Sequence, residues 1–369
     1  MKVEITRSAL LDKILFVSKT VIPKTTNYIL NGMVLEAEEN LNLLCTDLET
    51  SIKSQIEAKI LKKGRVVVPY KVLLNILRNF PEAKVNLEYV EEKNLLHINC
   101  ENSNFSLNTL PIEEYPQFPE INKKNTFNIE VEKFKYITSK VQKSCSTDES
   151  RMILTGILVD VDKGNLKMVS TDSYRLSLVE ESIKYEGENI KVVVPSRVLD
   201  NIVKSEFPKG DIEINTEENQ ISFIIKEKSG GETTIISRLL TGRFPEYEKL
   251  LPKDFKHSIV IDKAKTLEVI RRISSISQDN IPLKLIIGGG KINVSMNIRE
   301  VGSSSEDLEV AYGEEEIQIA FNPQFLIDGL SVMDGEKIIF SIVEPLKPVL
   351  LKPEKKDKSI YLLMPIRVS

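Results

Sequence analysis

The sequence predicts an α+β fold made of three similar domains, each with two helices packed on antiparallel sheets. The first observation is a repeated cassette, in which a hydrophobic strand leads into a helix that begins near a proline and ends at a turn. Its prolines are Pro69, Pro195 and Pro323, so the copies lie about 126 residues apart, which is the length of an ordinary domain. The second observation is that apolar residues around each cassette recur at helical and strand spacings.

Each copy contains two amphipathic helices. The first follows a short alternating strand and places apolar residues three and four positions apart, as in Leu10, Leu11, Ile14 and Leu15, which is the spacing of one helical face. The second begins at the proline of the cassette, because proline is well tolerated in the first turn of a helix. The six helices are expected at residues 8–20, 70–79, 131–143, 195–204, 262–275 and 324–333.

Alternating strands account for the rest of each copy, about eight per domain. Thr46-Asp47 and Thr171-Asp172 recur at the same strand end, which predicts a polar turn held by side-chain hydrogen bonds. The glycine-rich stretch 288–291 lies between two strands and not before a helix, so we interpret it as a hairpin turn and not as a phosphate-binding loop. The predicted domains cover residues 1–120, 126–250 and 255–369.

The composition is typical of a soluble folded protein. The chain has 369 residues, of which 41% are hydrophobic and 28% are charged, close to the averages for globular proteins. No apolar run is long enough to span a membrane, and the first residues read as a strand and not as a signal peptide. The three cysteines, Cys45, Cys100 and Cys145, lack metal-binding spacing, so we expect reduced thiols in the cytoplasm.

Catalytic motifs are not found in the sequence. His97 and His257 are its two histidines, and neither stands in a motif with a serine, a cysteine or a carboxylate, as nucleophilic catalysis would require. No Cys-x-x-Cys or His-Glu-x-x-His spacing indicates a metal. We therefore expect a protein that is not an enzyme and that needs no metal and no cofactor.

Charge is distributed unevenly between helices and strands. The six predicted helices carry eight more basic than acidic residues, so the rest of the chain carries twelve more acidic than basic ones, which gives the net charge of −4. If the helices share one surface, that surface attracts a polyanion while the remainder repels it. Ordinary solvated helix faces are the alternative explanation, because lysine is common on any exposed helix.

Five segments in register along the chain resemble the bacterial DNA sliding clamp family, the beta subunit of DNA polymerase III. The likeness covers the whole chain, including its three repeats, although each motif alone is weak. The segments are the N-terminal stretch 7–11, FSLNTLP at 105–111, STDSYRL at 170–176, RFPEY at 243–247 and YLLMPIR at 361–367.

The resemblance implies a ring around duplex DNA. Members of this family are head-to-tail homodimers, in which the three domains of each protomer form half of a closed ring, with the helices lining the hole. The basic helices would then contact phosphates without reading the base sequence. The candidate DNA contacts are Lys24, Lys71, Arg78, Lys133, Lys140, Arg197 and Lys204.

The resemblance also implies a pocket for short linear peptides between the second and third domains. Its partners would be the polymerase III catalytic subunit, the clamp loader and repair proteins. Apolar and methionine side chains suit a hydrophobic peptide anchor, although a plain final strand would also explain the apolar tail. The candidate pocket residues are Thr171, Ser173, Tyr174, Arg175, Leu176, Pro245, Lys249, Leu250, Phe325, Leu346, Pro348, Leu362, Leu363, Met364, Pro365, Ile366 and Arg367.

The expected dimer interface joins the first domain of one protomer to the third domain of the other. Phe105 and Leu107 match interface positions of the family, and Ile273 and Ile276 lie in the region that would meet them. Packing within one domain is the alternative for all four. The alternative for the whole protein is a repeat-built protein-interaction scaffold that does not encircle DNA.

Overall fold

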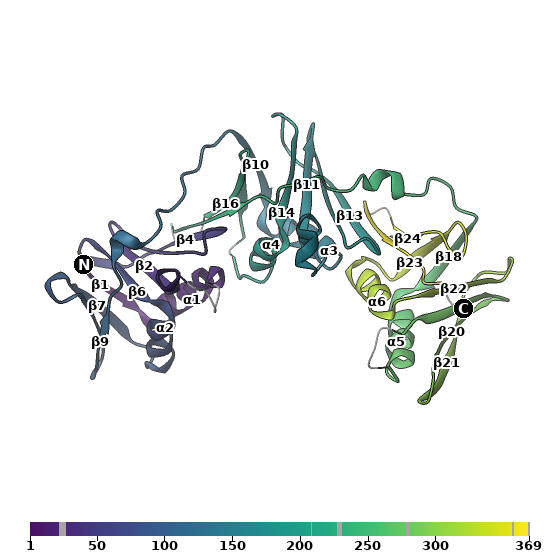
Figure 1. Cartoon of the computed structure of the whole chain (residues 1–369), viewed down its shortest axis with the longest axis horizontal. Helices are drawn as coiled ribbons and strands as arrows, with labels where there is room; N and C mark the ends of the chain where they lie inside the picture. Colours follow the sequence, from purple (N-terminus) through teal and green to yellow (C-terminus); the bar gives the residue numbers. More distant parts are fainter. Residues whose placement is uncertain (22–26, 208, 227–230, 278–280, 356–357, 368–369) are drawn as a thin grey trace. The chain divides into compact units, whose positions relative to one another are not determined.

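The computed structural model describes residues 1–21, 27–207, 209–226, 231–277, 281–355 and 358–367, and the chain forms two compact units (Figure 1). Unit 1 comprises residues 1–135, 184–188 and 201–239, and unit 2 comprises residues 136–183, 189–200 and 240–369. Each unit contains one eight-stranded sheet whose strands come from two of the predicted domains. The units therefore follow the sheets and not the order of the chain.

Unit 1 contains two antiparallel sheets. The smaller has the order β5, β1, β7, β8, β9, with the bounds Lys59–Lys62, Lys2–Thr6, Lys84–Val90, Leu95–Cys100 and Ser103–Asn108. The larger has the order β10, β15, β16, β17, β4, β3, β2, β6, with the bounds Asn125–Glu130, Asp211–Thr216, Gln220–Lys226, Glu232–Arg238, Thr50–Ile56, Leu41–Thr46, Gly32–Ala37 and Gly64–Pro69.

Unit 2 also contains two antiparallel sheets. The larger has the order β14, β11, β12, β13, β25, β24, β23, β18, with the bounds Ile190–Pro195, Gly156–Asp162, Asn165–Thr171, Arg175–Ser182, Ser359–Leu363, Val349–Pro353, Lys337–Ile342 and His257–Asp262. The smaller has the order β21, β20, β19, β22, with the bounds Gly302–Glu309, Lys291–Ile298, Leu283–Gly288 and Ile317–Phe321.

All six predicted helices are present, and their ends differ from the predicted ends by at most three residues. The largest difference is at the end of α1, where Ser18–Thr20 continue as a 3-10 helix. Among the described residues, the first predicted domain has nine strands, β1 to β9, and the others have eight each. The α-helices are α1 Arg7–Val17, α2 Tyr70–Asn79, α3 Val131–Gln142, α4 Ser196–Val203, α5 Lys263–Ser274 and α6 Pro323–Val332. Further 3-10 helices cover Tyr28–Asn31, Glu91–Lys93, Ile112–Glu114, Glu149–Thr155 and Tyr247–Leu250.

The helices pack in pairs on the sheets. In unit 1, α1 lies beside α2 and contacts β3 and β4, and in unit 2, α5 lies beside α6 and contacts β18, β20 and β21 (Figure 1). The buried side chains between them are mostly Ile, Leu, Val and Phe, as a packed core requires. Helices on antiparallel sheets confirm the predicted α+β class.

The start of each helix pair is held by the same contacts in all three copies. The backbone N–H of the first helix residue donates to Ala83 O, Gly210 O or Glu336 O, at 3.0, 2.9 and 2.8 Å. A basic side chain near that start also donates to a carbonyl at the end of the second helix, where the helix dipole favours positive charge. These donors are Arg7 to Leu77 O, Lys135 to Ser205 O and Lys263 to Met333 O. Part of the positive charge on the helices is therefore structural.

The structure also places the glycine-rich stretch, the three cysteines and His97. The stretch 288–291 is the tight turn between β19 and β20, as predicted. Cys45 and Cys100 are buried and Cys145 is half-buried, and burial raises the pKa of the Cys145 thiol to about 12. His97 contacts Ser106 at 2.9 Å, which is a strand-to-strand contact within one sheet.

Candidate functional site

The hairpin loop between β12 and β13 is fixed by its own polar side chains. Asp172 Oδ1 accepts hydrogen bonds from the backbone N–H groups of Tyr174 and Arg175, at 2.9 and 3.0 Å. Thr171 Oγ1 donates to Arg175 O at 2.7 Å and accepts from the N–H of Ser173, whose φ is 81°. The predicted polar turn is thus confirmed, and it points Tyr174 outward, since its side chain is 60% exposed.

The first domain repeats this loop between β3 and β4. Asp47 Oδ1 accepts from the N–H groups of Glu49 and Thr50, at 3.0 and 2.6 Å. Thr46 Oγ1 donates to Thr50 O and accepts from the N–H of Leu48, whose φ is 74°. The two loops therefore share one hydrogen-bond pattern, which makes Tyr174 and Glu49 structural equivalents.

Strand pairing brings the loop of unit 2 against the C-terminal tail. Antiparallel β13 and β25 pair with Arg175 opposite Leu363, and the N–H of Met364 donates to Tyr174 O at 2.9 Å. Two residues further on, the N–H of Ile366 donates to Ala320 O at 2.7 Å. These bonds hold the tail as an extended segment beside the loop.

An apolar surface lies under the loop and the tail. Leu176 and Leu362 are buried in one cluster with Tyr247, while Leu363 points to the opposite side, into the core of the third domain. This alternation is the ordinary geometry of a strand between two apolar layers. Four large apolar side chains of the predicted pocket remain substantially exposed: Tyr174, Leu250, Leu346 and Met364. Tyr174 and Met364 lie together, since the N–H of Met364 donates to Tyr174 O. Single exposed apolar residues are common, but exposed apolar residues that lie together indicate a binding surface.

Arg175 is buried next to Phe325 and Tyr174, which we call the pocket wall, and it is bound on two sides. Its Nε donates to Asp172 Oδ2 at 3.0 Å, and its Nη1 donates to Asp328 Oδ2 at 2.6 Å. Its guanidinium also lies 4.2 Å from the centre of the Phe325 ring, and that ring stacks with Tyr174 at 6.5 Å between centroids. The side chain is only 9% exposed, so Arg175 joins the loop to α6 and does not project toward solvent.

The remaining predicted pocket residues also belong to unit 2. Pro245 lines an open groove together with Phe244 and Tyr247, Lys249 is exposed and paired with Glu246, and Arg367 is exposed. Leu346 and Pro348 lie in the turn before β24. Pro365 is half-buried between Met364 and Ile366.

Sequence reasoning missed Asp172, Asp328 and Tyr361 as parts of this site. Tyr361 is 1% exposed, and its hydroxyl donates to Phe325 O at 2.7 Å, which fixes the start of α6. Asp328 had one available signal, because it is the charged residue of the last helix and has the opposite sign to most helix charges.

The equivalent position between the first two domains is polar. Glu49 and Arg238 stand where Tyr174 and Met364 stand in unit 2, and the N–H of Arg238 donates to Glu49 O at 2.8 Å. Their side chains form an exposed ion pair at 3.7 Å. The repeat therefore supplies the same backbone at both places, while the apolar side chains are found at the second one.

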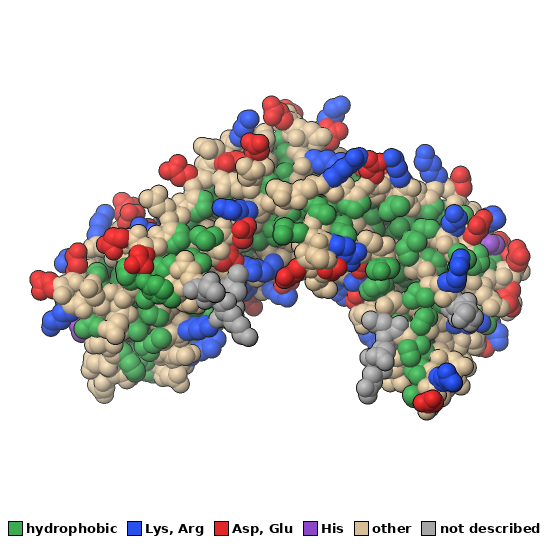
Figure 2. All heavy atoms as spheres, in the orientation of Figure 1, with side chains coloured by type: hydrophobic (Ala, Val, Ile, Leu, Met, Phe, Trp, Pro, Cys, Tyr) green, Lys and Arg blue, Asp and Glu red, His purple; other side chains and the backbone are tan. Residues whose placement is uncertain are grey.

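The predicted DNA contacts differ in how they are placed. Lys24 lies outside the described residues. Lys71 and Arg78 are exposed on α2, two turns apart on one side of the helix, and Arg197 and Lys204 are exposed on and just after α4. On the face shown in Figure 2, basic and acidic side chains are interspersed.

Lys133 and Lys140 lie on α3 and are less accessible. Lys133 is half-buried. The Lys140 side chain is 4% exposed, and its Nζ lies 2.6 Å from Asp334 Oδ2 and over the Tyr136 ring. Because a lysine held in a buried ion pair must break it before reaching a phosphate, we leave Lys140 out of the proposed DNA contacts.

Two of the predicted interface residues lie on an edge strand of unit 1, and the other two lie at the end of α5. Phe105 is 44% exposed and Leu107 is half-buried, both on the edge strand β9. Ile273 is 4% exposed in the core of the third domain, and Ile276 packs against that core. Phe105 also contacts Phe80, with 5.5 Å between ring centroids.

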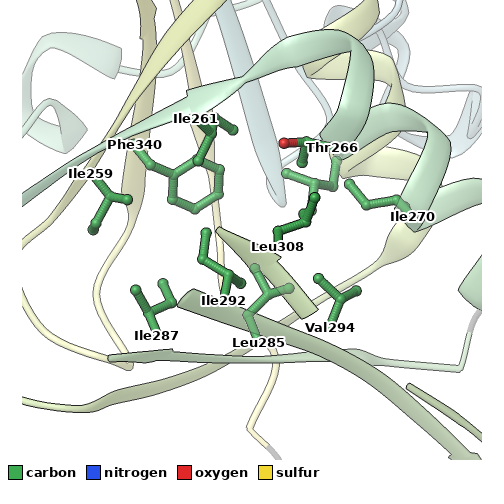
Figure 3. A pocket seen from close by; sticks show the side chains of 11 residues that line it. Ile259, Ile261, Thr266, Ile270, Leu285, Ile287, Ile292, Val294, Leu308 and Phe340 are labelled. Atoms are coloured by element: carbon green, nitrogen blue, oxygen red, sulfur yellow. The ribbon is translucent and has the colours of Figure 1, made fainter. Parts of the chain in front are cut away.

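A second hollow in unit 2 has a different character. It lies between α5 and two sheets and is lined by aliphatic side chains such as Ile259, Leu285 and Ile292 with Phe340 (Figure 3). Its volume of about 10 Å³ corresponds to roughly one water molecule. It is therefore a packing gap in the core and not a ligand site.

Family models match three consecutive segments of the chain. The N-terminal domain of the DNA polymerase III beta subunit matches residues 1–119, its central domain matches residues 128–246 and its C-terminal domain matches residues 248–367. The chain belongs to the DNA polymerase III beta subunit family. Three repeated clamp domains are thereby shown, and the resemblance read from the five segments is confirmed.

Curated and solved relatives agree with this family. The beta sliding clamp of Streptomyces coelicolor is 30% identical over 384 residues, covering 100% of both chains. The crystal structure of the DNA polymerase sliding clamp from Bacillus subtilis has a TM-score of 0.94 at 27% identity, again covering 100% of both chains. The sliding clamp from Bartonella birtlesii bound to griselimycin has a TM-score of 0.94 at 26% identity and the same coverage.

Membrane-spanning helices and metal clusters are two other features that a chain of this kind could carry. Within the described ranges, no helix of the chain is long and apolar enough to cross a membrane. In the same part of the chain, no group of three or more His, Cys, Asp or Glu side chains is placed to hold a metal ion.

Proposed function

We propose that this chain is a DNA sliding clamp, which forms a homodimeric ring around duplex DNA and tethers the replicative polymerase. The observation that carries the proposal is the threefold repeat, because it joins successive domains by one kind of strand pairing and leaves matching edges at both ends. A ring made in this way stays on DNA by topology, so each contact can be weak. Its work is to hold partners and not to catalyse a reaction.

The repeat supports a specific partner for the edge strand β9. In each domain the chain that leaves the last strand donates a backbone N–H to the strand before the second helix, at 2.7 to 2.9 Å. This contact makes the residues at the ends of the three domains equivalent. The three pairs are Leu110 to Val67 O, Leu240 to Val193 O and Ile366 to Ala320 O.

Two of these ends pair with a hairpin loop of the preceding domain. Two residues before each anchor, Arg238 donates to Glu49 O and Met364 donates to Tyr174 O. The equivalent residue in the first domain is Asn108, at the end of the edge strand β9, where a third domain would take the place of the preceding one. A second copy of the chain would supply that domain, which is a head-to-tail interface that closes into a ring.

The same equivalence pairs β9 with β21 of the partner subunit. In this register Asn108 would lie near the loop before that β21, and Phe105 would face the strand. Both β9 and β21 are edge strands with exposed side chains, and unpaired edges favour strand addition. Ile273 and Ile276 would then support the interface from the α5 side.

The helices supply the proposed DNA-facing surface. Exposed Lys71, Arg78, Arg197 and Lys204 can contact phosphates, and such contacts carry no base specificity and weaken with salt. Weak, non-specific contacts suit a ring that must slide. A ring on chromosomal DNA would be found with the nucleoid in the bacterial cytoplasm.

The apolar surface around Tyr174 and Met364 is the proposed partner pocket. Its exposed apolar side chains and the exposed loop between β12 and β13 suit short hydrophobic peptides. The proposed partners that would supply such peptides are the polymerase III catalytic subunit, the clamp loader and repair proteins. Because the relative from Bartonella birtlesii is bound to griselimycin, we expect griselimycin to bind this chain, and we propose the Tyr174 and Met364 pocket as its site. Griselimycin is therefore the probe of that pocket.

Replacing Lys71 and Arg78 with glutamine should weaken DNA binding and its salt dependence. Each phosphate contact contributes about 0.9 to the slope of log affinity against log salt, so the double variant should lower the slope by about 1.8. The measurement is fluorescence anisotropy of a labelled linear duplex at several salt concentrations, with griselimycin affinity unchanged.

The matched control is Lys62→Gln with Lys63→Gln, which removes two exposed charges at the end of β5. A slope that changes equally in both double variants would contradict a DNA-facing helix surface. It would favour a scaffold whose net charge alone determines binding.

A further inference from the structure

Asp328 on α6 lies between two cations of unit 2. Its Oδ2 accepts the hydrogen bond from Arg175 Nη1 at 2.6 Å, and its Oδ1 lies 3.8 Å from Lys143 Nζ. Gln324 also donates to Oδ1, at 2.9 Å. The Asp328 carboxylate therefore interacts with Arg175 through one oxygen and with Lys143 and Gln324 through the other.

Through Arg175, the Asp328 carboxylate is connected to the proposed partner pocket. Arg175 is bound by Asp172 at 3.0 Å, so Asp172 and Asp328 together hold its guanidinium over the Phe325 ring. Phe325 in turn stacks with Tyr174, with planes 30° apart. The side chains of Arg175 and Asp328 are 9% and 15% exposed, so solvent screens their attraction weakly.

The Lys143 side belongs to the basic helix surface. Lys143 directly follows α3, which carries Lys133, and its side chain is 45% exposed. Its Nζ donates to Ser331 Oγ at 2.7 Å, and Ser331 Oγ donates to Asp328 O at 2.9 Å. Lys143 therefore contacts α6 while remaining accessible to a phosphate.

We propose that Asp328 couples the helix surface to the partner pocket, with Arg175 as the positioning residue that transmits its charge. When a phosphate draws Lys143 away, the carboxylate acts on Arg175 alone and holds the Phe325 and Tyr174 wall more firmly. A preordered wall loses less freedom on binding and so binds a partner more tightly. The inference rests on the proposed DNA and pocket functions, and coupling of this kind is reciprocal.

The test is a double-mutant cycle read out as griselimycin affinity by calorimetry on the full-length protein. Lys143→Gln should raise the affinity about twofold to fivefold, the range of a partly exposed ion pair, although the residue does not contact the pocket wall in the described structure. Asp328→Asn should lower the affinity, and Lys143→Gln should then have no further effect. Lys337→Gln, an exposed lysine on β23, is the charge-matched control and should leave affinity unchanged.

Binding of duplex DNA to the wild type should have the same effect on griselimycin affinity as the substitution Lys143→Gln. Saturating short duplex should raise griselimycin affinity by a similar factor in the wild type and leave it unchanged in Lys143→Gln. If griselimycin binds the wild type, Lys143→Gln and Lys337→Gln with equal affinity, the coupling is overturned but the proposed pocket is not. No griselimycin binding to the wild type would overturn the proposed pocket and the coupling with it.

Discussion

Phe105→Asp should convert the protein from a particle of twice the 41.8 kDa chain mass to a monomer. Phe105 is 44% exposed on the edge strand β9, and in the proposed register it is covered by β21 of the partner subunit. A carboxylate there loses the apolar burial and must be desolvated without a cation. About 4 kcal/mol of lost interface free energy is expected, which raises the dimer dissociation constant roughly 1,000-fold. Sedimentation or light scattering measures the mass.

Leu61→Asp is the matched control for that prediction. Leu61 is 50% exposed on β5, at the opposite edge of the same sheet, and the proposed ring leaves it uncovered. The control should remain dimeric with an unchanged melting temperature. A dimeric Phe105→Asp variant, or a Leu61→Asp variant that also dissociates, would place the interface elsewhere.

Arg175→Met should produce the largest loss of stability among single changes in the pocket wall. It removes the cation between Asp172 and Asp328, whose side chains are 11% and 15% exposed, and leaves two nearly buried carboxylates facing each other. Breaking a buried pair in this way costs about 3–5 kcal/mol. Griselimycin affinity should fall at least about tenfold, because Phe325 and Tyr174 lose their support. Urea unfolding and calorimetry measure the two effects.

Two variants separate the positioning role of Arg175 from a general loss of charge. Arg175→Lys keeps the charge and loses the planar fork that reaches both carboxylates, so it should recover part of the stability and little of the griselimycin affinity. Arg243→Met removes an arginine whose side chain is 81% exposed and should change neither quantity measurably. An Arg175→Met variant as stable as Arg243→Met would contradict the buried network.

The helices were predictable because their signals are local. Apolar spacing and a proline at the start of the second helix place α2 and α6 within one residue of the structure. The polar loop at Asp172 was predictable for the same reason, since its hydrogen bonds join residues within four positions of each other. Local patterns also placed the turn before Lys291.

The roles of individual charges were not predictable, because they depend on partners far along the chain. Lys140 looked like any helical lysine, yet its partner Asp334 is 194 residues away. Arg175 and Asp328 are 153 residues apart, and Lys135 donates a hydrogen bond to Ser205 O at the end of α4. The count of helix charges therefore predicts a basic helix surface, but it includes residues whose charge is used inside the fold.

The pocket residues required the family resemblance, since the tail alone reads as an ordinary final strand. What the structure adds is the reason for their position: β13 and β25 pair so that the Tyr174 loop and Met364 meet. The same backbone arrangement between the first two domains carries Glu49 and Arg238 instead. Divergence between repeats, and not the repeat itself, distinguishes the proposed partner site.

Retention on circular DNA tests the central claim most directly. The protein is loaded on a nicked plasmid by a bacterial clamp loader, isolated by gel filtration and then treated with a restriction enzyme that cuts the plasmid once. A ring held by topology is predicted to stay on the circle through a high-salt wash and to slide off within minutes of linearisation. Equal retention on circular and linear DNA would contradict encirclement.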